Sequence, residues 1–196
     1  MRPRGLSLKP SDHLKTEIVS IKHMLSALNG LCSKLDKDSE LILCEIRKTV
    51  RVICSFVDHY HNAKEVQELC PELEKVCSQS EKEKLNAFKK EGLHIHDILK
   101  SIKLIVSRKE GPVDTDKLIK VSKEFIELEK KHINEEESFI IPLLKTATTT
   151  SIKGRIEKRF KHFEDESFGK DRNLHQAVNK VFHRMSDIYS GAGSMN

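Results

Sequence analysis

Apolar residues recur at every third or fourth position along most of the chain, which is the spacing of one face of an α-helix. The first stripe follows Pro10 and predicts a helix that extends to about Leu35. It consists of Leu14, Ile18, Ile21, Leu25 and Leu28. A second stripe predicts a long helix up to Pro71, because proline disfavours helical geometry in the residue before it. It consists of Leu43, Ile46, Val50, Ile53 and Val57.

Two further stripes predict a third and a fourth helix. Ser80 and Glu83 have the spacing of a capping box, so we expect the third helix to begin there and to stop at the breaker sequence 110–112. Its apolar face consists of Leu85, Phe88, Gly92, Leu99, Ile102 and Val106. The fourth helix is predicted to end near Pro142, and its face carries Leu118, Val121, Phe125 and Leu128.

Four long helices joined by short linkers predict an all-α fold, an up-down-up-down four-helix bundle. No segment alternates between apolar and polar residues over a useful length, so we expect no sheet. The expected organisation is a loose arm over 1–10, the bundle over 11–146 and a helical appendage over 147–196 that packs on the bundle. Two shorter helices are predicted inside the appendage, at about 152–166 and 172–189.

Composition excludes several classes of protein. With 196 residues the chain has room for one domain, or one domain with an appendage. Eight glycines and five prolines exclude collagen, and 35 basic residues against 30 acidic ones argue against a disordered chain. No apolar run approaches the roughly 18 residues of a membrane-spanning helix. The net charge of +5 is mild, so we expect neither nucleic acid nor a membrane as a partner.

The cysteines and the first residues indicate a compartment. Five cysteines are an odd number, and none of them has CxxC spacing, which argues against a zinc finger. The first twelve residues contain two arginines but no apolar stretch, so we expect no signal peptide. These observations predict a cytoplasmic protein with free thiols.

The most informative feature is an internal repeat at the ends of the second and fourth predicted helices. Segments 61–71 and 132–142 both read H-x3-E-x5-P, and every matching position is offset by 71 residues. The apolar stripes that precede the two segments match as well. The repeat therefore predicts two helices that contribute the same polar groups to one site.

Each repeat places a histidine and a glutamate one helical turn apart, as His61 with Glu65 and His132 with Glu136. Both pairs continue the apolar stripes, so we expect them to face the interior. Unpaired charges there would be costly, whereas a bound cation would stabilise them. Imidazole together with carboxylate favours Fe, Mn or Zn over Ca or Mg.

The third helix adds a fifth candidate ligand. His96 lies four residues after Gly92 and three before Leu99, so we expect its side chain to face the interior. His94 lies about 200° around the helix from His96 and is expected to face outward.

These segments resemble a known family. The sequence FVDHYHNAKEVQELCPELE (56–74) resembles the second-helix signature of the hemerythrin-like, HHE cation-binding family, and HINEEESFIIPLL (132–144) resembles its fourth-helix signature. GLHIHDILKSI (92–102) is similar to the third, with His96 in the ligand position. The resemblance covers about 10–190.

The resemblance implies a four-helix bundle that holds two non-haem irons, bridged by oxygen and by two carboxylates. Glu65 and Glu136 would be the bridging residues, and His61, His96 and His132 would be terminal ligands. Members of the family bind O₂, sense O₂ or NO, handle iron, or take part in repairing nitrosative damage.

The first helix departs from the family pattern. Members generally carry a histidine at the position that Ile18 occupies here. A regular helix turns His13 and His23 away from that face, and Glu17 reaches only its edge. We therefore expect a site that is short of one ligand, with one metal held weakly. Whether one of these side chains replaces the ligand, and whether one or two metals bind, stays open at this stage.

Two hypotheses follow from the sequence. The first is a di-iron protein that binds or senses O₂ or NO, or handles iron; no substrate motif such as GxGxxG, a P-loop or a nucleophile elbow is present, so binding is favoured over turnover. The second is a helical interaction protein whose site is degenerate and partly or wholly free of metal. Metal content separates the two hypotheses.

Overall fold

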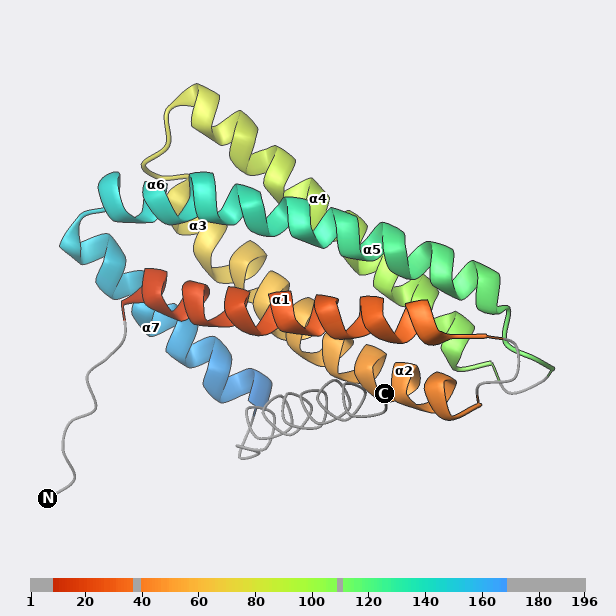
Figure 1. Ribbon diagram of the computed structural model, residues 1–196. Helices are drawn as coiled ribbons and strands as arrows, with labels where there is room; N and C mark the ends of the chain where they lie inside the picture. Colours follow the sequence, from red (N-terminus) through yellow and green to blue (C-terminus); the bar gives the residue numbers. More distant parts are fainter. Residues whose placement is uncertain (1–8, 37–39, 109–110, 169–196) are drawn as a thin grey trace, which may run out of the picture.

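The computed structural model describes residues 9–36, 40–108 and 111–168, and within these ranges the chain is helical and contains no strand (Figure 1). The elements are α1 (Pro10–Lys34), α2 (Glu40–Ile53), the π-helical segments η1 (Cys54–Asn62) and η2 (Glu65–Leu69), α3 (Cys70–Leu73), α4 (Gln79–Val106), α5 (Thr115–Glu135), the π-helical η3 (Glu136–Ile140), α6 (Ile141–Thr146) and α7 (Thr150–Phe168). The prediction of an all-α fold is confirmed for these residues.

The four long helices α1, α2, α4 and α5 pack around a shared interior. α1 contacts α2 and α5, and α4 contacts α2 and α5. Figure 1 shows successive long helices running in opposite directions. Their apolar stripes form one core cluster, because each helix turns one face toward the other three.

The two prolines of the repeat do not end their helices. Pro71 lies in α3 and Pro142 in α6, and each follows a π-helical segment. In η2 the Cys70 backbone N–H donates to the Glu65 carbonyl, five residues back, and in η3 Ile141 donates to Glu136 in the same way. A proline ring clashes with the carbonyl four residues before it, so the wider π-turn lets the helix continue.

The start of α4 differs from the prediction by two residues. Ser78 is the N-cap, and its hydroxyl accepts from the backbone N–H of Glu81. The Glu81 carboxylate in turn accepts from the Ser78 backbone N–H at 2.7 Å. Ser80 and Glu83 have the same spacing, but both lie inside the helix, where the Glu83 N–H donates to the carbonyl four residues back and needs no cap.

The regions at the two ends are described only in part. α7 packs on η2 and α1, and it coincides with the first helix predicted for the appendage. The second predicted stretch, 172–189, lies outside the described residues, as do residues 1–8 of the predicted arm. All five cysteines are free. Among the described helices, none combines the length and the apolar character needed to cross a membrane.

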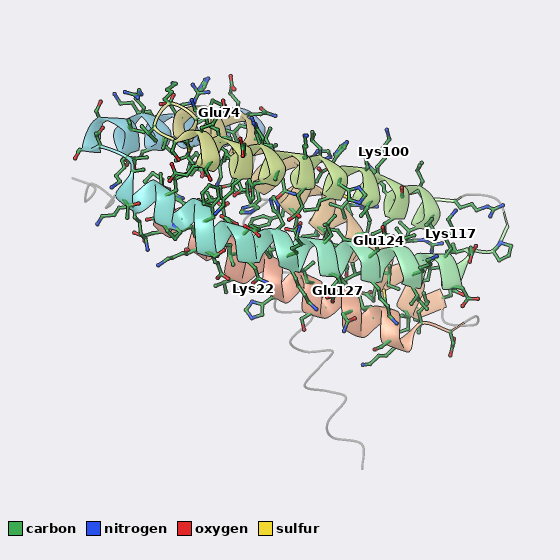
Figure 2. All side chains as sticks on the ribbon, turned by 90° about the horizontal axis from the view of Figure 1, so that it is seen from above. Lys22, Glu74, Lys100, Lys117, Glu124 and Glu127 are labelled. Carbon is green, nitrogen blue, oxygen red and sulfur yellow. The ribbon has the colours of Figure 1, made fainter. Side chains whose placement is uncertain are left out.

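Most charged side chains point away from the interior, as Figure 2 shows for Lys22, Lys100, Glu124 and Glu127. A minority is buried. These buried side chains are Glu17, His61, Lys64, Glu65, Glu72, Glu129, His132 and Glu136. Since burial of a charge is costly unless it is paired, their arrangement needs a specific explanation.

Candidate metal centre

Both histidine–glutamate pairs of the repeat lie in the interior, where the π-helical segments meet α2 and α5. The exposed fraction of His61, Glu65, His132 and Glu136 is at most 1%. η1 ends with His61 and η2 begins with Glu65, while α5 carries His132 and η3 begins with Glu136. The structure thus brings together four of the five ligands predicted from the sequence.

The Nε2 atoms of the two imidazoles face the two carboxylates. His61 Nε2 lies 3.3 Å from Glu136 Oε2 and 3.8 Å from Glu65 Oε2. His132 Nε2 lies 3.4 Å from the same oxygen of Glu65. One ligand atom from each of His61, Glu65 and Glu136 fits within a mutual distance of 4.8 Å. Glu65 therefore stands between the two imidazoles, and three donors already have the spacing of a metal site.

The opposite ring nitrogen of each imidazole faces another carboxylate. Glu17 of α1 lies 2.8 Å from His61 Nδ1, and Glu91 of α4 lies 3.6 Å from His132 Nδ1. A carboxylate at Nδ1 favours the tautomer that carries its proton there, which leaves the Nε2 lone pair free to bind a metal. A carboxylate thus lies behind each imidazole, within hydrogen-bond distance on the Glu17 side and only at ion-pair distance on the Glu91 side.

Glu17 is held in its charged form by a buried lysine. Lys64 has no exposed surface, and its ammonium group contacts the Glu17 carboxylate, as does the Tyr60 hydroxyl at 3.0 Å. Burial alone would raise the pKa of Glu17, but Lys64 and His61 outweigh it and lower the pKa to about 2. The outer carboxylate of His61 therefore stays ionised across the physiological range of pH.

The His132 ring is fixed by packing as well as by charge. Phe88 stacks on it with ring centroids 4.1 Å apart and an angle of 13° between the planes. Gly92, one turn further along α4, lies beside the ring. A Cβ atom built there would be in van der Waals contact with the ring, 3.7 Å from His132 Cε1. The imidazole thus has little freedom to rotate away from Glu65.

The prediction that His96 faces the interior is wrong. The His96 side chain is 47% exposed, and its Nδ1 lies 2.8 Å from Asp58 Oδ1 at the surface. The buried positions of α4 repeat with alternating spacings of three and four residues. They are Leu85, Phe88, Gly92, Ile95, Leu99, Ile102 and Val106, and Ile98 is buried beside them. In this heptad pattern Ile95 takes the inward position after Gly92, and His96 is turned about 100° away.

On the first helix, the side chain that faces the centre is Glu17. The Ile18 side chain is buried and apolar, with 1% exposed, and offers no donor at this position. His23 is exposed, and His13 is half-buried and lies 3.9 Å from Glu164. Sequence reasoning placed Glu17 at the edge of the site; the structure instead places it behind His61.

Three buried carboxylates near the imidazoles have oxygens without a hydrogen-bond partner among the described residues. Glu65 has one oxygen without a hydrogen-bond partner, and Glu129 and Glu136 have both. Burial and the neighbouring Glu65 charge raise the pKa of Glu136, and burial raises that of Glu129. Burial disfavours the charged form of His61, but Glu136 and Glu65 outweigh it and raise its pKa. A cluster of this kind is stabilised either by protons or by a metal cation, and its N and O donors suit Fe, Mn or Zn.

Comparisons with known proteins add nothing to the geometry of the centre. No family model, curated protein or solved structure matches the chain.

Sequence reasoning missed three groups that surround the donors. Glu91 immediately precedes Gly92 on the buried stripe, and Glu129 lies three residues before His132, on the same face of α5. Their spacing was a usable signal for both. Lys64 gave no such signal, because a lysine next to a histidine–glutamate pair is usually solvated.

A second group of potential ligands lies at the surface next to Glu17. His13, Glu17 and Glu164 also offer ligand atoms within 4.8 Å of one another. Here, however, Lys64 already neutralises Glu17, and Tyr60 donates toward Glu164 at 2.8 Å. A cation would have to compete with the buried ammonium group, so the interior centre is the stronger candidate.

Proposed function

We propose that this protein is a hemerythrin-like four-helix bundle protein that binds iron in its interior and binds or senses O₂ or NO, or handles iron. The inner ligands would be His61, Glu65, His132 and Glu136. Glu65 would be shared between the two imidazoles, which favours two metal ions over one.

The observation that carries the proposal is the position of the His61 ring between two sets of carboxylates. Glu17 lies 2.8 Å from Nδ1, and Glu136 lies 3.3 Å from Nε2. A histidine that binds a metal through one ring nitrogen usually donates its other N–H to a carboxylate, which is the arrangement of Glu17 behind His61. The unpartnered oxygens of Glu136 support the same conclusion.

The burial of the centre favours a small ligand. Since the four inner side chains are at most 1% exposed, a diatomic gas reaches them more readily than a substrate of metabolite size. Iron would supply reversible redox chemistry for such a ligand. The chain's own residues hold the donors, fix the tautomers of the imidazoles and exclude bulk water.

The two metal positions should differ in strength. His61, Glu65 and Glu136 form a group of three donors whose atoms lie within 4.8 Å of one another. His132 has only one of these donors nearby, Glu65, at 3.4 Å. Ile18 adds no donor from α1, and the exposed His96 adds none from α4. We therefore expect one iron to be lost first on mild chelation.

A second candidate function has a specific observation in its favour. The missing donors at Ile18 and His96 also fit a helical interaction protein with a degenerate site, in which protons neutralise the buried carboxylates. Such a protein would be fully folded without metal and would not take up iron.

The deciding experiment is metal analysis of the full chain after anaerobic loading with Fe(II). We expect bound iron that survives gel filtration, together with a ligand-to-metal charge-transfer band after oxidation. A folded protein that retains no Fe, Mn or Zn after loading would refute the proposal and support the interaction protein.

A further inference from the structure

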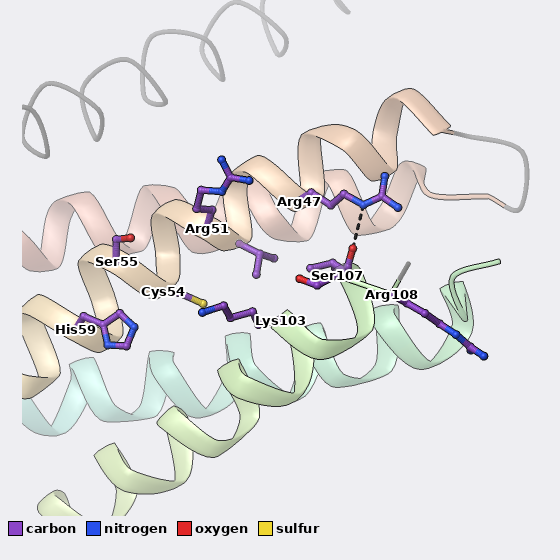
Figure 3. A pocket seen from close by; sticks show the side chains of 10 residues that line it. Arg47, Arg51, Cys54, Ser55, His59, Lys103, Ser107 and Arg108 are labelled. Atoms are coloured by element: carbon purple, nitrogen blue, oxygen red, sulfur yellow. Dashed lines mark hydrogen bonds between the residues drawn. The ribbon is translucent and has the colours of Figure 1, made fainter. Parts of the chain in front are cut away.

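A basic groove lies on the outside of the molecule, between α2 with the start of η1 and the C-terminal end of α4 (Figure 3). Its cavity has a volume of about 430 Å³. The groove is lined by Arg47, Val50, Arg51, Cys54, Ser55, His59, Lys103, Val106, Ser107 and Arg108. None of these residues belongs to the metal centre or to its outer shell.

The charge of the groove is one-sided. Four of the lining residues are arginines or lysines, and no carboxylate lines the cavity in the part of the chain that the structure describes. Arg47 has partners: its Nη1 lies 2.9 Å from Glu40, and its Nε donates to the Val106 carbonyl at 3.0 Å. The latter contact satisfies a carbonyl at the end of α4, which is the ordinary role of a cation at a helix C-terminus.

The other cations are not explained in this way. Arg51, Lys103 and Arg108 are exposed, and no ion pair joins them to any side chain within 9–36, 40–108 and 111–168. Both Arg51 of α2 and Lys103 of α4 line the cavity. In Figure 3 Lys103 reaches toward Cys54, whereas the Arg51 guanidinium points away from Lys103. Like charges gathered around one cavity repel each other, and a bound anion that draws in Arg51 would remove that repulsion.

The remaining lining groups suit binding and not covalent chemistry. Ser55 and Ser107 supply hydroxyl donors beside the cations. The Cys54 thiol is not a nucleophile here, because burial and the nearby Asp58 charge raise its pKa to about 11 despite Lys103. The groove therefore offers hydroxyl and cationic donors to a ligand, and its cysteine does not react with it.

We propose that this groove binds a small anion through a diphosphate group. Guanidinium groups pair with phosphate oxygens in bidentate fashion, and a lysine adds a point charge. The cavity volume falls within the range of small-molecule sites. The lining contains the His59 imidazole but no phenylalanine, tyrosine or tryptophan, and its four cations outnumber the groups that could contact a base, so we take the phosphate chain, free or carried by a nucleotide, as the recognised group. This inference does not rest on the proposed metal function.

The test is calorimetric titration of the full chain with pyrophosphate and, in a second arm, with ADP. Both titrations are carried out on chelator-treated protein, because pyrophosphate also binds metals. We expect saturable binding with similar affinity for the two ligands. Arg51→Gln and Lys103→Gln should each weaken binding by about tenfold or more, since each removes a charge-assisted hydrogen bond. Both side chains are exposed, so the variants should fold normally.

One control separates this site from others. Lys117→Gln removes an exposed lysine at the start of α5 and should leave pyrophosphate affinity unchanged (Figure 2). Absence of saturable binding at millimolar pyrophosphate, or equal weakening by Lys117→Gln, would overturn the proposal. An affinity for ADP more than tenfold above that for pyrophosphate would overturn the assignment of the diphosphate as the recognised group.

Discussion

His61 Nδ1 lies 2.8 Å from Glu17 Oε2, so the first helix reaches the candidate centre through a carboxylate that lies behind His61. Glu17 is in turn paired with Lys64, which has no exposed surface. A buried ammonium group therefore sets the charge of a carboxylate, and the carboxylate sets the tautomer of the imidazole. Changes at Glu17 should consequently alter metal affinity without removing an inner donor.

Glu17→Gln should weaken metal binding by about 10- to 100-fold while leaving the number of bound ions unchanged at saturating iron. The amide keeps the shape of the side chain but loses the charge that stabilises the Nδ1 proton. Competition with a chelator of known affinity measures the effect. A lower stoichiometry at saturation would instead identify Glu17 as a direct ligand.

Because the pKa of Glu17 is lowered, we expect the free energy of unfolding to depend on pH. The native pKa of Glu17 is about 2, below the ordinary 4.5, so between these values the unfolded chain binds more protons than the folded one. The contribution of Glu17 is therefore complete above pH 4.5 and is lost as pH falls toward 2, with a size of about 3 kcal/mol. Urea unfolding of metal-free wild type and Glu17→Gln should show a difference at pH 6 that shrinks at pH 3. A constant difference would contradict the lowered pKa.

Glu136→Gln should abolish the increase in melting temperature that iron gives to the wild-type protein. Glu136 is fully buried and faces His61, and metal binding by such a residue contributes to folding. Glu135→Gln and Glu137→Gln change the neighbouring exposed carboxylates and should keep the metal-dependent increase. Similar losses in all three variants would show that the helical face is assigned wrongly.

His132→Ala and His96→Ala should have opposite outcomes in metal analysis. His132 faces Glu65 at 3.4 Å, so its removal should lose the weaker iron and leave the one held by His61, Glu65 and Glu136. His96 is bound to Asp58 at the surface, so its removal should leave the iron content unchanged. Loss of iron in His96→Ala would mean that α4 rotates on metal binding.

Ser78→Ala should destabilise the protein by about 1 kcal/mol, because it removes the N-cap of α4. Ser80→Ala is the matched control, since Ser80 has the same apparent spacing to Glu83 but lies inside the helix. It should change the free energy of unfolding by much less. Chemical denaturation gives the free energy of unfolding of both variants. A larger loss in Ser80→Ala than in Ser78→Ala would mean that the helix begins at the residue predicted from the sequence.

The local pattern of the sequence determined the helices and most of the inner site. The stripes around Val50 and Phe125 are local, and the repeat carries His61 and His132 inward because a helix fixes which residues share a face. Even the two prolines were informative, although they mark a π-helical widening before Pro71 and Pro142 and not the end of a helix.

What only the tertiary structure decided is which side chains from different helices meet. Positions 95 and 96 of α4 lie close to the same face in the sequence pattern, and the heptad packing against the other helices selects Ile95 and leaves His96 in solvent. The contacts of Glu17 with His61 and of Glu91 with His132 join residues 44 and 41 positions apart. Local propensity carries no information on such pairs, because they depend on how the helices are rotated and shifted against each other. Burial of Lys64 follows from the same docking, since its partner Glu17 comes from another helix.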